Sequence, residues 1–275
     1  MDPHVEPPVR VAAVQMVSTP DPERNMADAE RLVAQAAADG ATLVLLPEYF
    51  CLMGRHERDK LALAESAGAP DAPLQGRLSA LARRHRIWLV AGSLPVRSGD
   101  PERVFNTTFV YNPDGEGVAR YDKIHLFSFA RDAESYDEGR TIAPGTQTVA
   151  FQAPFGRVGL SICYDLRFPE LYRSLGDCAL IVVPAAFTHT TGQAHWETLL
   201  RARAVENQCY VLAAAQGGEH ENGRRTWGHS MLIDPWGEIV AQCESGAGVV
   251  SGALDARRLA EVRRSLPALA HRVLG

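Results

Sequence analysis

The feature of this sequence that most constrains its fold is the alternation of short apolar runs with helical patterns along the chain. Residues 41–46 form one such run, which is mostly aliphatic and too short for a typical helix. Gly40 separates it from an alanine-rich helical pattern at 25–39. Strands that are apolar on both faces belong in a sheet covered by other layers. We therefore predict an α/β protein whose mixed sheet is covered by helices on its outer faces.

Periodicity and turn residues predict the individual elements. The sequences Asn-Pro-Asp-Gly at 112–115 and Asp-Pro-Trp-Gly at 234–237 predict hairpin turns. Helices are expected at 25–39, at 78–84, after Pro169, at 194–206 and at 256–265, and strands at 10–16, 41–46, 87–92, 106–111, 118–121, 157–162, 180–183, 210–215, 229–233, 239–241 and 249–254.

Length and charge narrow the class of protein. The 275 residues, 46% of them hydrophobic and 22% charged, predict one large domain over 1–275 without a linker. The net charge of −5 and the dispersed basic residues argue against a nucleic-acid surface. No apolar stretch reaches the roughly 20 residues of a membrane helix, and residues 1–8 lack the pattern of a secretory signal. We expect a small-molecule partner.

The five cysteines are odd in number and scattered, without a Cys-x-x-Cys pair, which favours a reduced, cytoplasmic protein. Cys178 and Cys209 are expected in the core. The spacing of His189 and His195 does not suit zinc, and the glycines at 156 and 159 do not form a dinucleotide fingerprint. We expect neither a metal nor a cofactor.

Cys163 ends the apolar run at 157–162 and is followed by a helix led by Pro169. This order places the thiol at the carboxyl edge of a sheet, near helix N-terminal amides that would favour the thiolate. Cys163 is therefore a candidate nucleophile, and the alternative is a buried structural cysteine.

Glu48 and Lys123 also follow predicted strands. Taken alone, Glu48 could cap a helix and Lys123 could be solvated. Together with Cys163 they supply what amide hydrolysis needs, because a carboxylate can accept the thiol proton and later deliver it to the departing amine. Lys123 and the backbone N–H of Tyr164 could then stabilise the oxyanion.

The segments around these residues, 46–49, 121–127 and 159–170, resemble the Glu-Lys-Cys triad motifs of the nitrilase superfamily of carbon–nitrogen hydrolases, and the resemblance covers roughly residues 10–265. It implies a four-layer α-β-β-α sandwich of the nitrilase type. It also implies that Glu48 is the general base, Lys123 the oxyanion stabiliser and Cys163 the nucleophile that forms a thioester.

The family also has a second active-site glutamate between the lysine and a Pro-Gly pair, here Pro144-Gly145. Glu138 is the favoured residue for this role, and Glu134 is the rival. The resemblance further implies a homodimer. The helix after Cys163, with Leu166, Phe168, Leu171 and Tyr172, offers an apolar surface for that contact, although core packing explains the same residues.

Segments 194–211 and 227–237 resemble one branch of the superfamily, the deaminated glutathione amidases. This implies hydrolysis of deaminated glutathione to 2-oxoglutarate and cysteinylglycine, a metabolite-repair reaction. Much of the pattern is shared with the omega-amidases, which act on 2-oxoglutaramate. An N-carbamoyl amino acid hydrolase is a further alternative, and the sequence does not decide whether nitriles are accepted.

Two other classes remain open. A papain-like protease would pair the cysteine with a histidine such as His125, His195 or His229, but none has a distinctive setting. A packing or hydrogen-bonding role is expected for His125. An inactive binding or scaffold relative could keep the same fold, although it would have no need of all three triad residues.

The polar segment 187–197 follows a predicted strand and is expected on the same rim as Cys163. Thr188, Thr191 and His195 are therefore candidates for substrate contact. The alternative is a helix start with hydroxyl caps. Arg167 could bind a substrate carboxylate or anchor its helix through Glu170.

Overall fold

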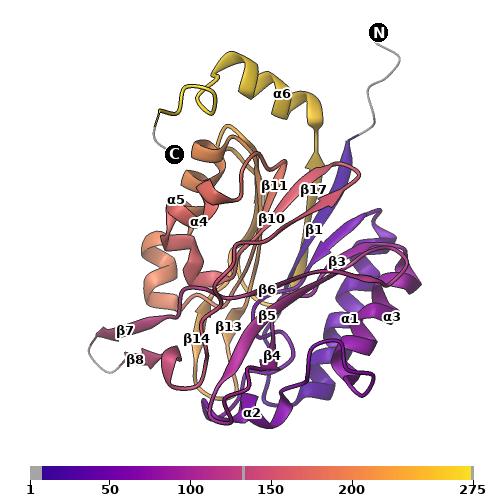
Figure 1. Cartoon of the computed structure of the whole chain (residues 1–275), viewed down its shortest axis with the longest axis vertical. Coiled ribbons are helices and arrows are strands. Elements are labelled where there is room, and N and C mark those ends of the chain that lie inside the picture. The colour runs from indigo at the N-terminus through magenta and orange to yellow at the C-terminus, as the bar shows by residue number, and fades with distance from the viewer. Residues whose placement is uncertain (1–7, 132–133, 274–275) are drawn as a thin grey trace.

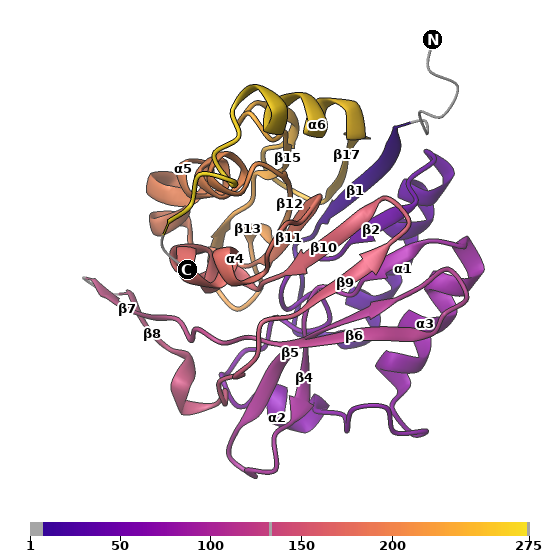
Figure 2. The ribbon, with the colours of Figure 1, turned by 45° about the horizontal axis from the view of Figure 1, so that its top comes forward.

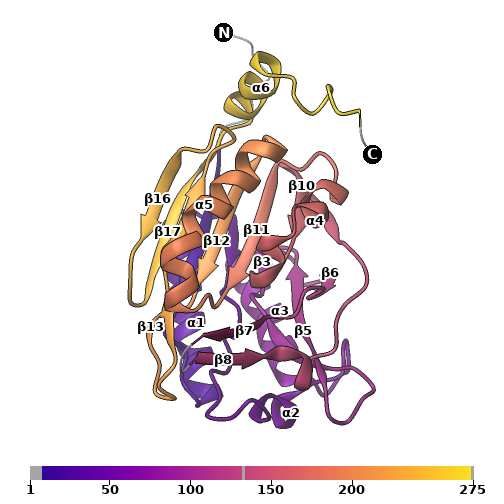
Figure 3. The same ribbon diagram turned by 90° about the vertical axis from the view of Figure 1, so that its left-hand side faces the viewer.

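Two β-sheets packed face to face form the middle of the molecule, and helices cover both outer sides (Figure 1). The computed structural model describes residues 8–131 and 134–273. Helices α1 (Pro22–Ala38) and α3 (Pro73–His85) cover the first sheet. Helices α4 (Pro169–Ser174) and α5 (His189–Asn207) lie over the second sheet, as Figure 3 shows. The predicted α-β-β-α sandwich is confirmed.

The first sheet has the strand order β17-β1-β2-β3-β5-β4, with β6 also paired to β5. Its β1, β2 and β3 are parallel, and the remaining pairings are antiparallel. Its strands are β1 (Val9–Gln15), β2 (Leu43–Leu45), β3 (Trp88–Val90), β4 (Leu94–Arg97), β5 (Val104–Tyr111), β6 (Gly117–Asp122) and β17 (Gly248–Leu254). Strand β4 lies outside every range in which the sequence predicts a strand.

The second sheet has the order β16-β15-β12-β11-β10-β9, and its β10, β11 and β12 are parallel. Its strands are β9 (Ala150–Ala153), β10 (Gly156–Leu160), β11 (Leu180–Ala185), β12 (Tyr210–Ala215), β15 (Ser230–Ile233) and β16 (Ile239–Cys243). Two hairpins stand apart from both sheets: β7 (Ser128–Arg131) with β8 (Glu134–Asp137), and β13 (Gly217–Glu219) with β14 (Arg225–Trp227). The β7–β8 hairpin extends away from the sheets (Figure 2).

Capping residues decide where the helices begin. Helix α1 starts earlier than predicted because the Asp21 carboxylate accepts hydrogen bonds from the N–H groups of Glu23 and Arg24. Helix α3 starts at Pro73, a residue suited to the first turn. The remaining helical segments are α2 (Asp59–Leu63), η1 (Glu138–Arg140), η2 (Cys163–Arg167) and α6 (Ala256–Ser265), of which α6 matches its predicted range. Within the described residues, no helix is long and apolar enough to cross a membrane.

The parallel strands β1, β2 and β3 of the first sheet are buried on both faces, which explains their continuous apolar runs. In β1, Val11 and Ala13 belong to the core between the sheets, whereas Ala12 and Val14 pack with the helices on the outer side. All four are fully buried. A strand in this position needs apolar residues at every position rather than at alternate ones.

The helix after Cys163 packs inward. Leu166, Leu171 and Tyr172 are all buried in the core of their own chain. The core-packing alternative therefore holds for these three residues, whereas Phe168 is half-buried. Cys178 and Cys209 are also buried in this core, as predicted.

Candidate active site

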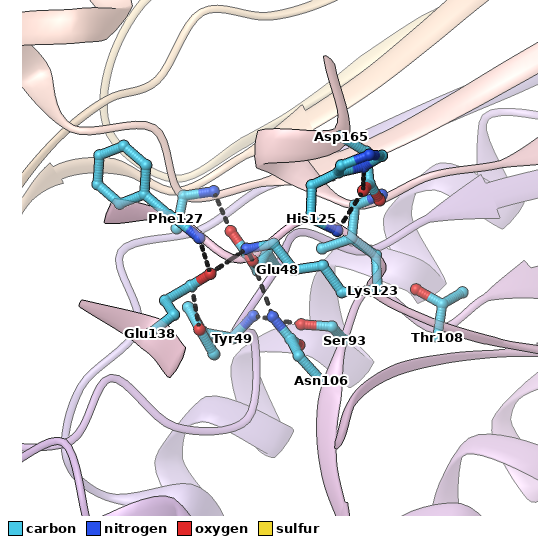
Figure 4. A network of polar contacts seen from close by, with 12 residues as sticks. Glu48, Tyr49, Ser93, Asn106, Thr108, Lys123, His125, Phe127, Glu138 and Asp165 are labelled. Carbon is cyan, nitrogen blue, oxygen red and sulfur yellow. Dashed lines mark hydrogen bonds and ion pairs between the residues drawn. The ribbon is translucent and has the colours of Figure 1, made fainter. Parts of the chain in front are cut away.

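Side chains from segments that are far apart in sequence, among them Glu48, Lys123 and Glu138, point toward one another (Figure 4). Glu48, Glu138 and Cys163 line the same pocket. Glu48 follows β2, Lys123 follows β6 directly, and Cys163 is the first residue of η2, just beyond β10. The Lys123 ammonium lies 2.8 Å from Glu48 Oε1 and 2.8 Å from Glu138 Oε2. The Lys123 and Glu48 side chains are 0% and 1% exposed, so these charges interact with little screening by water.

The backbone is left-handed at two points in this site. Cys163 has φ 50° and Tyr49 has φ 55°, a conformation that costs a non-glycine residue about 1–2 kcal/mol. Arg86 and Gln208 also have positive φ, but they stand at the carboxyl ends of α3 and α5, where this conformation is common. At Cys163 it turns the chain sharply from β10 into η2.

Two glycines allow close backbone contacts next to the site residues. A Cβ atom on Gly92 would lie 2.2 Å from the Pro47 carbonyl oxygen, and one on Gly145 would lie 2.1 Å from that of Asp122. The Gly145 N–H also donates to the Lys123 carbonyl at 2.8 Å. The two glycines therefore let neighbouring segments of the same chain pack directly against the peptide bonds that precede Glu48 and Lys123.

The Glu48 carboxylate is held by donors on both oxygens. Oε1 accepts hydrogen bonds from Lys123 Nζ at 2.8 Å and from Asn106 Nδ2 at 2.9 Å. Oε2 accepts one from the Ala186 N–H at 2.9 Å. These bonds hold the carboxylate in one orientation next to the thiol.

Glu138 is buried at the start of η1 and holds Lys123 from the other side. Its Oε1 accepts a hydrogen bond from the Tyr49 hydroxyl, and its Oε2 accepts one from the Phe127 N–H, both at 2.7 Å. Burial acts to raise the pKa of Glu138, but Lys123 and these hydrogen bonds outweigh it and hold the pKa below its usual value. The rival Glu134 begins β8, opposite Arg131, and its side chain lies outside the described part.

The Glu48 and Glu138 carboxylates raise the pKa values of both Lys123 and Cys163. Burial acts to lower the pKa of Lys123, but the charges of Glu138 and Glu48 outweigh it and raise the pKa. Burial and the charge of Glu48 raise the pKa of the Cys163 thiol well above its usual value, against the opposing effect of Lys123. The raised pKa keeps the resting thiol protonated, so the structure does not support the thiolate that helix amides were expected to favour.

The thiol opens into a small pocket of about 10 Å³ that Tyr164, Arg167, Thr188, Thr191 and Arg224 help to line. Thr188 caps α5, where its hydroxyl accepts the Thr191 N–H at 3.4 Å. The segment from 189 onward is therefore helix, as the capping alternative holds, and not a polar loop.

His195 is exposed on α5 and does not line this pocket. Its Nδ1 lies 3.2 Å from Nη1 of Arg167. Arg167 packs over the rings of Tyr164 and Phe187, and it has no ion pair with Glu170 in the described residues.

The other candidate histidine roles have structural explanations. His125 Nδ1 lies 2.7 Å from Asp165 Oδ1, and its ring stacks on Phe168 at 3.7 Å, which agrees with a packing and hydrogen-bonding role. His229 stacks on Trp227. No histidine lines the thiol pocket in residues 8–131 and 134–273, which argues against a Cys/His protease.

Comparison with known proteins identifies the family. The profile of the carbon-nitrogen hydrolase family matches residues 10–264. The chain belongs to this family. Membership makes the protein an amide-hydrolysing enzyme and confirms the resemblance to the nitrilase superfamily.

Relatives of this carbon–nitrogen hydrolase cover nearly its whole length. It is 42% identical over 272 residues to a deaminated glutathione amidase of Synechocystis, covering 97% of this chain and 98% of the relative. The crystal structure of Nit3 from Saccharomyces cerevisiae, a member of branch 10 of the nitrilase superfamily, matches with a TM-score of 0.86 and 29% identity, covering 98% of each chain. NitFhit of Caenorhabditis elegans matches with a TM-score of 0.86 and 39% identity over 96% of this chain, which spans 65% of NitFhit.

Sequence reasoning misses several residues of the site. Tyr49 stands next to Glu48, and Asn106 begins a predicted strand with a polar side chain, so both carry a weak signal. The backbone N–H groups of Phe127 and Ala186 carry none. Arg224 lies between β13 and β14, where nothing in the sequence links it to the site. No group of three or more His, Cys, Asp and Glu residues in the described ranges is arranged to hold a metal ion.

Proposed function

We propose that this enzyme hydrolyses deaminated glutathione at the amide between its 2-oxoacyl group and the dipeptide, with Glu48, Lys123 and Cys163 as the catalytic triad. The observation that most directly supports the triad is that the Lys123 ammonium contacts two buried carboxylates beside a buried thiol. The choice of substrate is supported by the relative named deaminated glutathione amidase, which aligns with 97% of this chain.

In the first step, Glu48 accepts the thiol proton as Cys163 Sγ attacks the carbonyl carbon. The raised pKa of the thiol means that proton transfer accompanies the attack rather than preceding it. The oxyanion is stabilised by Lys123 and by the backbone N–H of Tyr164. Tyr164 is in the first turn of η2, so its N–H has no acceptor within that helix.

The tetrahedral intermediate then collapses and the carbon–nitrogen bond breaks. Glu48 gives its proton to the departing amine, cysteinylglycine leaves, and the 2-oxoacyl group remains on Cys163 as a thioester. Water then attacks this thioester while Glu48 accepts a proton from the water. The carbon–sulfur bond breaks, Glu48 returns the proton to Cys163 Sγ, and 2-oxoglutarate is released. Glu138 acts as a positioning residue that holds Lys123.

Arg167 and the α5 hydroxyls complete the proposed acyl site. Arg167 lines the thiol pocket and has no carboxylate partner among the described residues. It suits the carboxylate of the 2-oxoacyl group. Thr188 and Thr191 line the same pocket and remain candidates for substrate contact, whereas the exposed His195 would act only through Arg167.

The proposal includes a single catalytic domain over 1–275 and a cytoplasmic homodimer. The family resemblance supports the dimer, and five free cysteines fit a reducing compartment. Light scattering at micromolar concentration tests the assembly, and a mass near the 29.9 kDa of one chain would reject the dimer.

The substrate is tested by measuring 2-oxoglutarate release from deaminated glutathione beside ammonia release from 2-oxoglutaramate and from an N-carbamoyl amino acid. We expect the highest kcat/KM for deaminated glutathione. A kcat/KM at least about tenfold higher for 2-oxoglutaramate, or about 1.4 kcal/mol of transition-state preference, would assign the omega-amidase reaction instead. No turnover of any amide would favour a binding or scaffold role.

A further inference from the structure

A second, larger cavity adjoins the thiol pocket. It has a volume of about 330 Å³, and Tyr49, Lys60, Tyr136 and Arg224 are among its lining residues. A small space of about 10 Å³ is bordered by Tyr49, Tyr136 and Arg224 from the cavity side and by Glu138 from the thiol side. Arg224 borders all three spaces and therefore stands at the junction between the thiol and the large cavity.

The Arg224 guanidinium has unused hydrogen-bonding capacity. Of its five N–H donors, Nη2 supplies one hydrogen bond, to the Ala186 carbonyl at 3.3 Å. Its Nε is buried without a partner, and no carboxylate pairs with it in the part of the chain described. The guanidinium also packs over the Tyr136 ring, 5.3 Å from the ring centroid. Burial acts to lower the pKa of Arg224, but interactions with Tyr49 and with the Glu48 and Glu138 carboxylates outweigh burial and raise the pKa, so the guanidinium stays charged.

Other cations on the cavity are already paired or exposed. Lys60 forms an ion pair with Glu57 at 2.6 Å and donates to the Thr141 hydroxyl at 3.2 Å. Arg55 and His56 are exposed to solvent. Among these cations, Arg224 is the half-buried one that forms no ion pair within the described residues.

We propose that the large cavity receives the amine side of the substrate and that Arg224 binds a carboxylate on that leaving group. This inference rests on the proposed function, which places the scissile amide at Cys163. Arg167 borders the thiol pocket but not the large cavity, so the two arginines would bind carboxylates on opposite sides of the amide. The site then selects amides whose leaving amine is an amino acid or peptide with a free carboxylate over primary amides.

The test compares deaminated glutathione with the same compound in which the glycine carboxylate is a carboxamide. The wild type should show a kcat/KM at least about tenfold lower for the carboxamide. Arg224→Gln should remove this preference and should lower kcat/KM at least about tenfold more for deaminated glutathione than for 2-oxoglutaramate, and Arg224→Lys should retain part of the preference. The matched control is Arg225→Gln, because Arg225 is exposed and pairs with the exposed Glu219 at 3.2 Å. It should keep the full preference.

Two results would overturn the proposal: equal kcat/KM for both compounds in the wild type, or an equal loss on 2-oxoglutaramate and deaminated glutathione in Arg224→Gln. The comparison of the two compounds in the wild type tests the proposal even if the variant does not fold.

Calorimetric titration of both compounds into Cys163→Ala separates this proposal from the proposed function, because binding can be measured without turnover. If the wild type hydrolyses neither compound, the proposed function fails. Arg224 recognition then stands if the carboxylate compound binds about tenfold more tightly, and falls if binding is equal or absent.

Discussion

Cys163 and Cys209 lie at opposite ends of the parallel strands of the second sheet, Cys163 at the carboxyl end and Cys209 at the amino end. Cys163 follows β10 and Cys209 directly precedes β12, and these strands run parallel through β11. Both thiols are buried in the same core, and burial is the largest cause that raises the pKa of each. Burial and a raised pKa therefore do not distinguish a nucleophile from a structural cysteine.

The neighbours of the two thiols do distinguish them. Cys163 has the Glu48 carboxylate as a proton acceptor and the Lys123 ammonium as a cation for the developing negative charge. Near Cys209 lie Cys178, Arg263 and Glu206, but these charged groups are already engaged. Arg263 donates to the carbonyls of Gln208 and Cys178, and Glu206 forms an ion pair with Arg203. The carboxyl edge of the parallel strands thus gathers reactive partners, whereas the amino edge gathers packing partners.

The sharpest test removes the thiol at the carboxyl edge. Cys163→Ala should lower kcat by at least about a thousandfold, because no other group can form the thioester. Intact-mass measurement of the wild type during slow turnover should detect an acyl adduct, and peptide mapping should locate it on Cys163. Undiminished turnover in Cys163→Ala, or an adduct on Cys51, would contradict the assignment of Cys163 as the nucleophile.

The next test removes the partners and keeps the thiol. Glu48→Gln removes the proton acceptor and Lys123→Met removes the cation, so each should lower kcat by at least about a hundredfold. Circular dichroism should report a folded Glu48→Gln. Lys123→Met should also be less stable, because it leaves two buried carboxylates without their cation. If either variant kept more than about a tenth of wild-type kcat, the residue would not have the proposed role.

Glu138 should have a smaller effect because it acts through Lys123. Glu138→Gln should lower kcat by at least about tenfold, since the amide cannot hold the ammonium as the carboxylate does. Glu134→Gln, at the start of β8, is the matched control and should change kcat little. The opposite ranking of these two variants would transfer the positioning role to Glu134.

The contribution of the Glu138–Lys123 ion pair to the free energy of unfolding should depend on pH. The pKa of Glu138 is lowered in the folded chain despite burial, because of Lys123 and the hydrogen bonds to the carboxylate. Its contribution is therefore complete above the unfolded-state pKa of about 4.3 and is lost as the pH falls through the folded-state pKa. Urea unfolding should show wild type more stable than Glu138→Gln at pH 6, with a difference that shrinks below about pH 4. A difference independent of pH would contradict this linkage.

The smallest effect is expected at the amino edge. Cys209→Ala removes a buried sulfur from the core and should lower the free energy of unfolding by about 1 kcal/mol, with kcat unchanged. Urea denaturation and steady-state kinetics on the same preparation check both parts. A large loss of kcat without a loss of stability would show that Cys209 takes part in catalysis rather than in core packing.

Local signals in the sequence were sufficient to predict the strands that carry the triad. Apolar runs ending at polar residues predicted where Glu48, Lys123 and Cys163 would stand. The choice of Glu138 came from the family resemblance, through its distance from the Pro-Gly at 144–145, and the structure places Glu138 against Lys123. The hairpin turn at 112–115 also formed between β5 and β6 as predicted. These features depend on neighbours in the chain, so sequence reasoning can find them.

The tertiary structure alone decided the electrostatics of the site. The Ala186 N–H that holds Glu48 lies 138 positions away in sequence, and no local pattern pairs them. The raised pKa of Cys163, the division of the strands into two sheets, and the place of Arg224 between two cavities likewise depend on which segments pack together. The sequence by itself determined which residues stand at strand ends, because backbone periodicity is local. Burial and charge at a point in space are sums over distant segments, and only the folded chain brings those segments together.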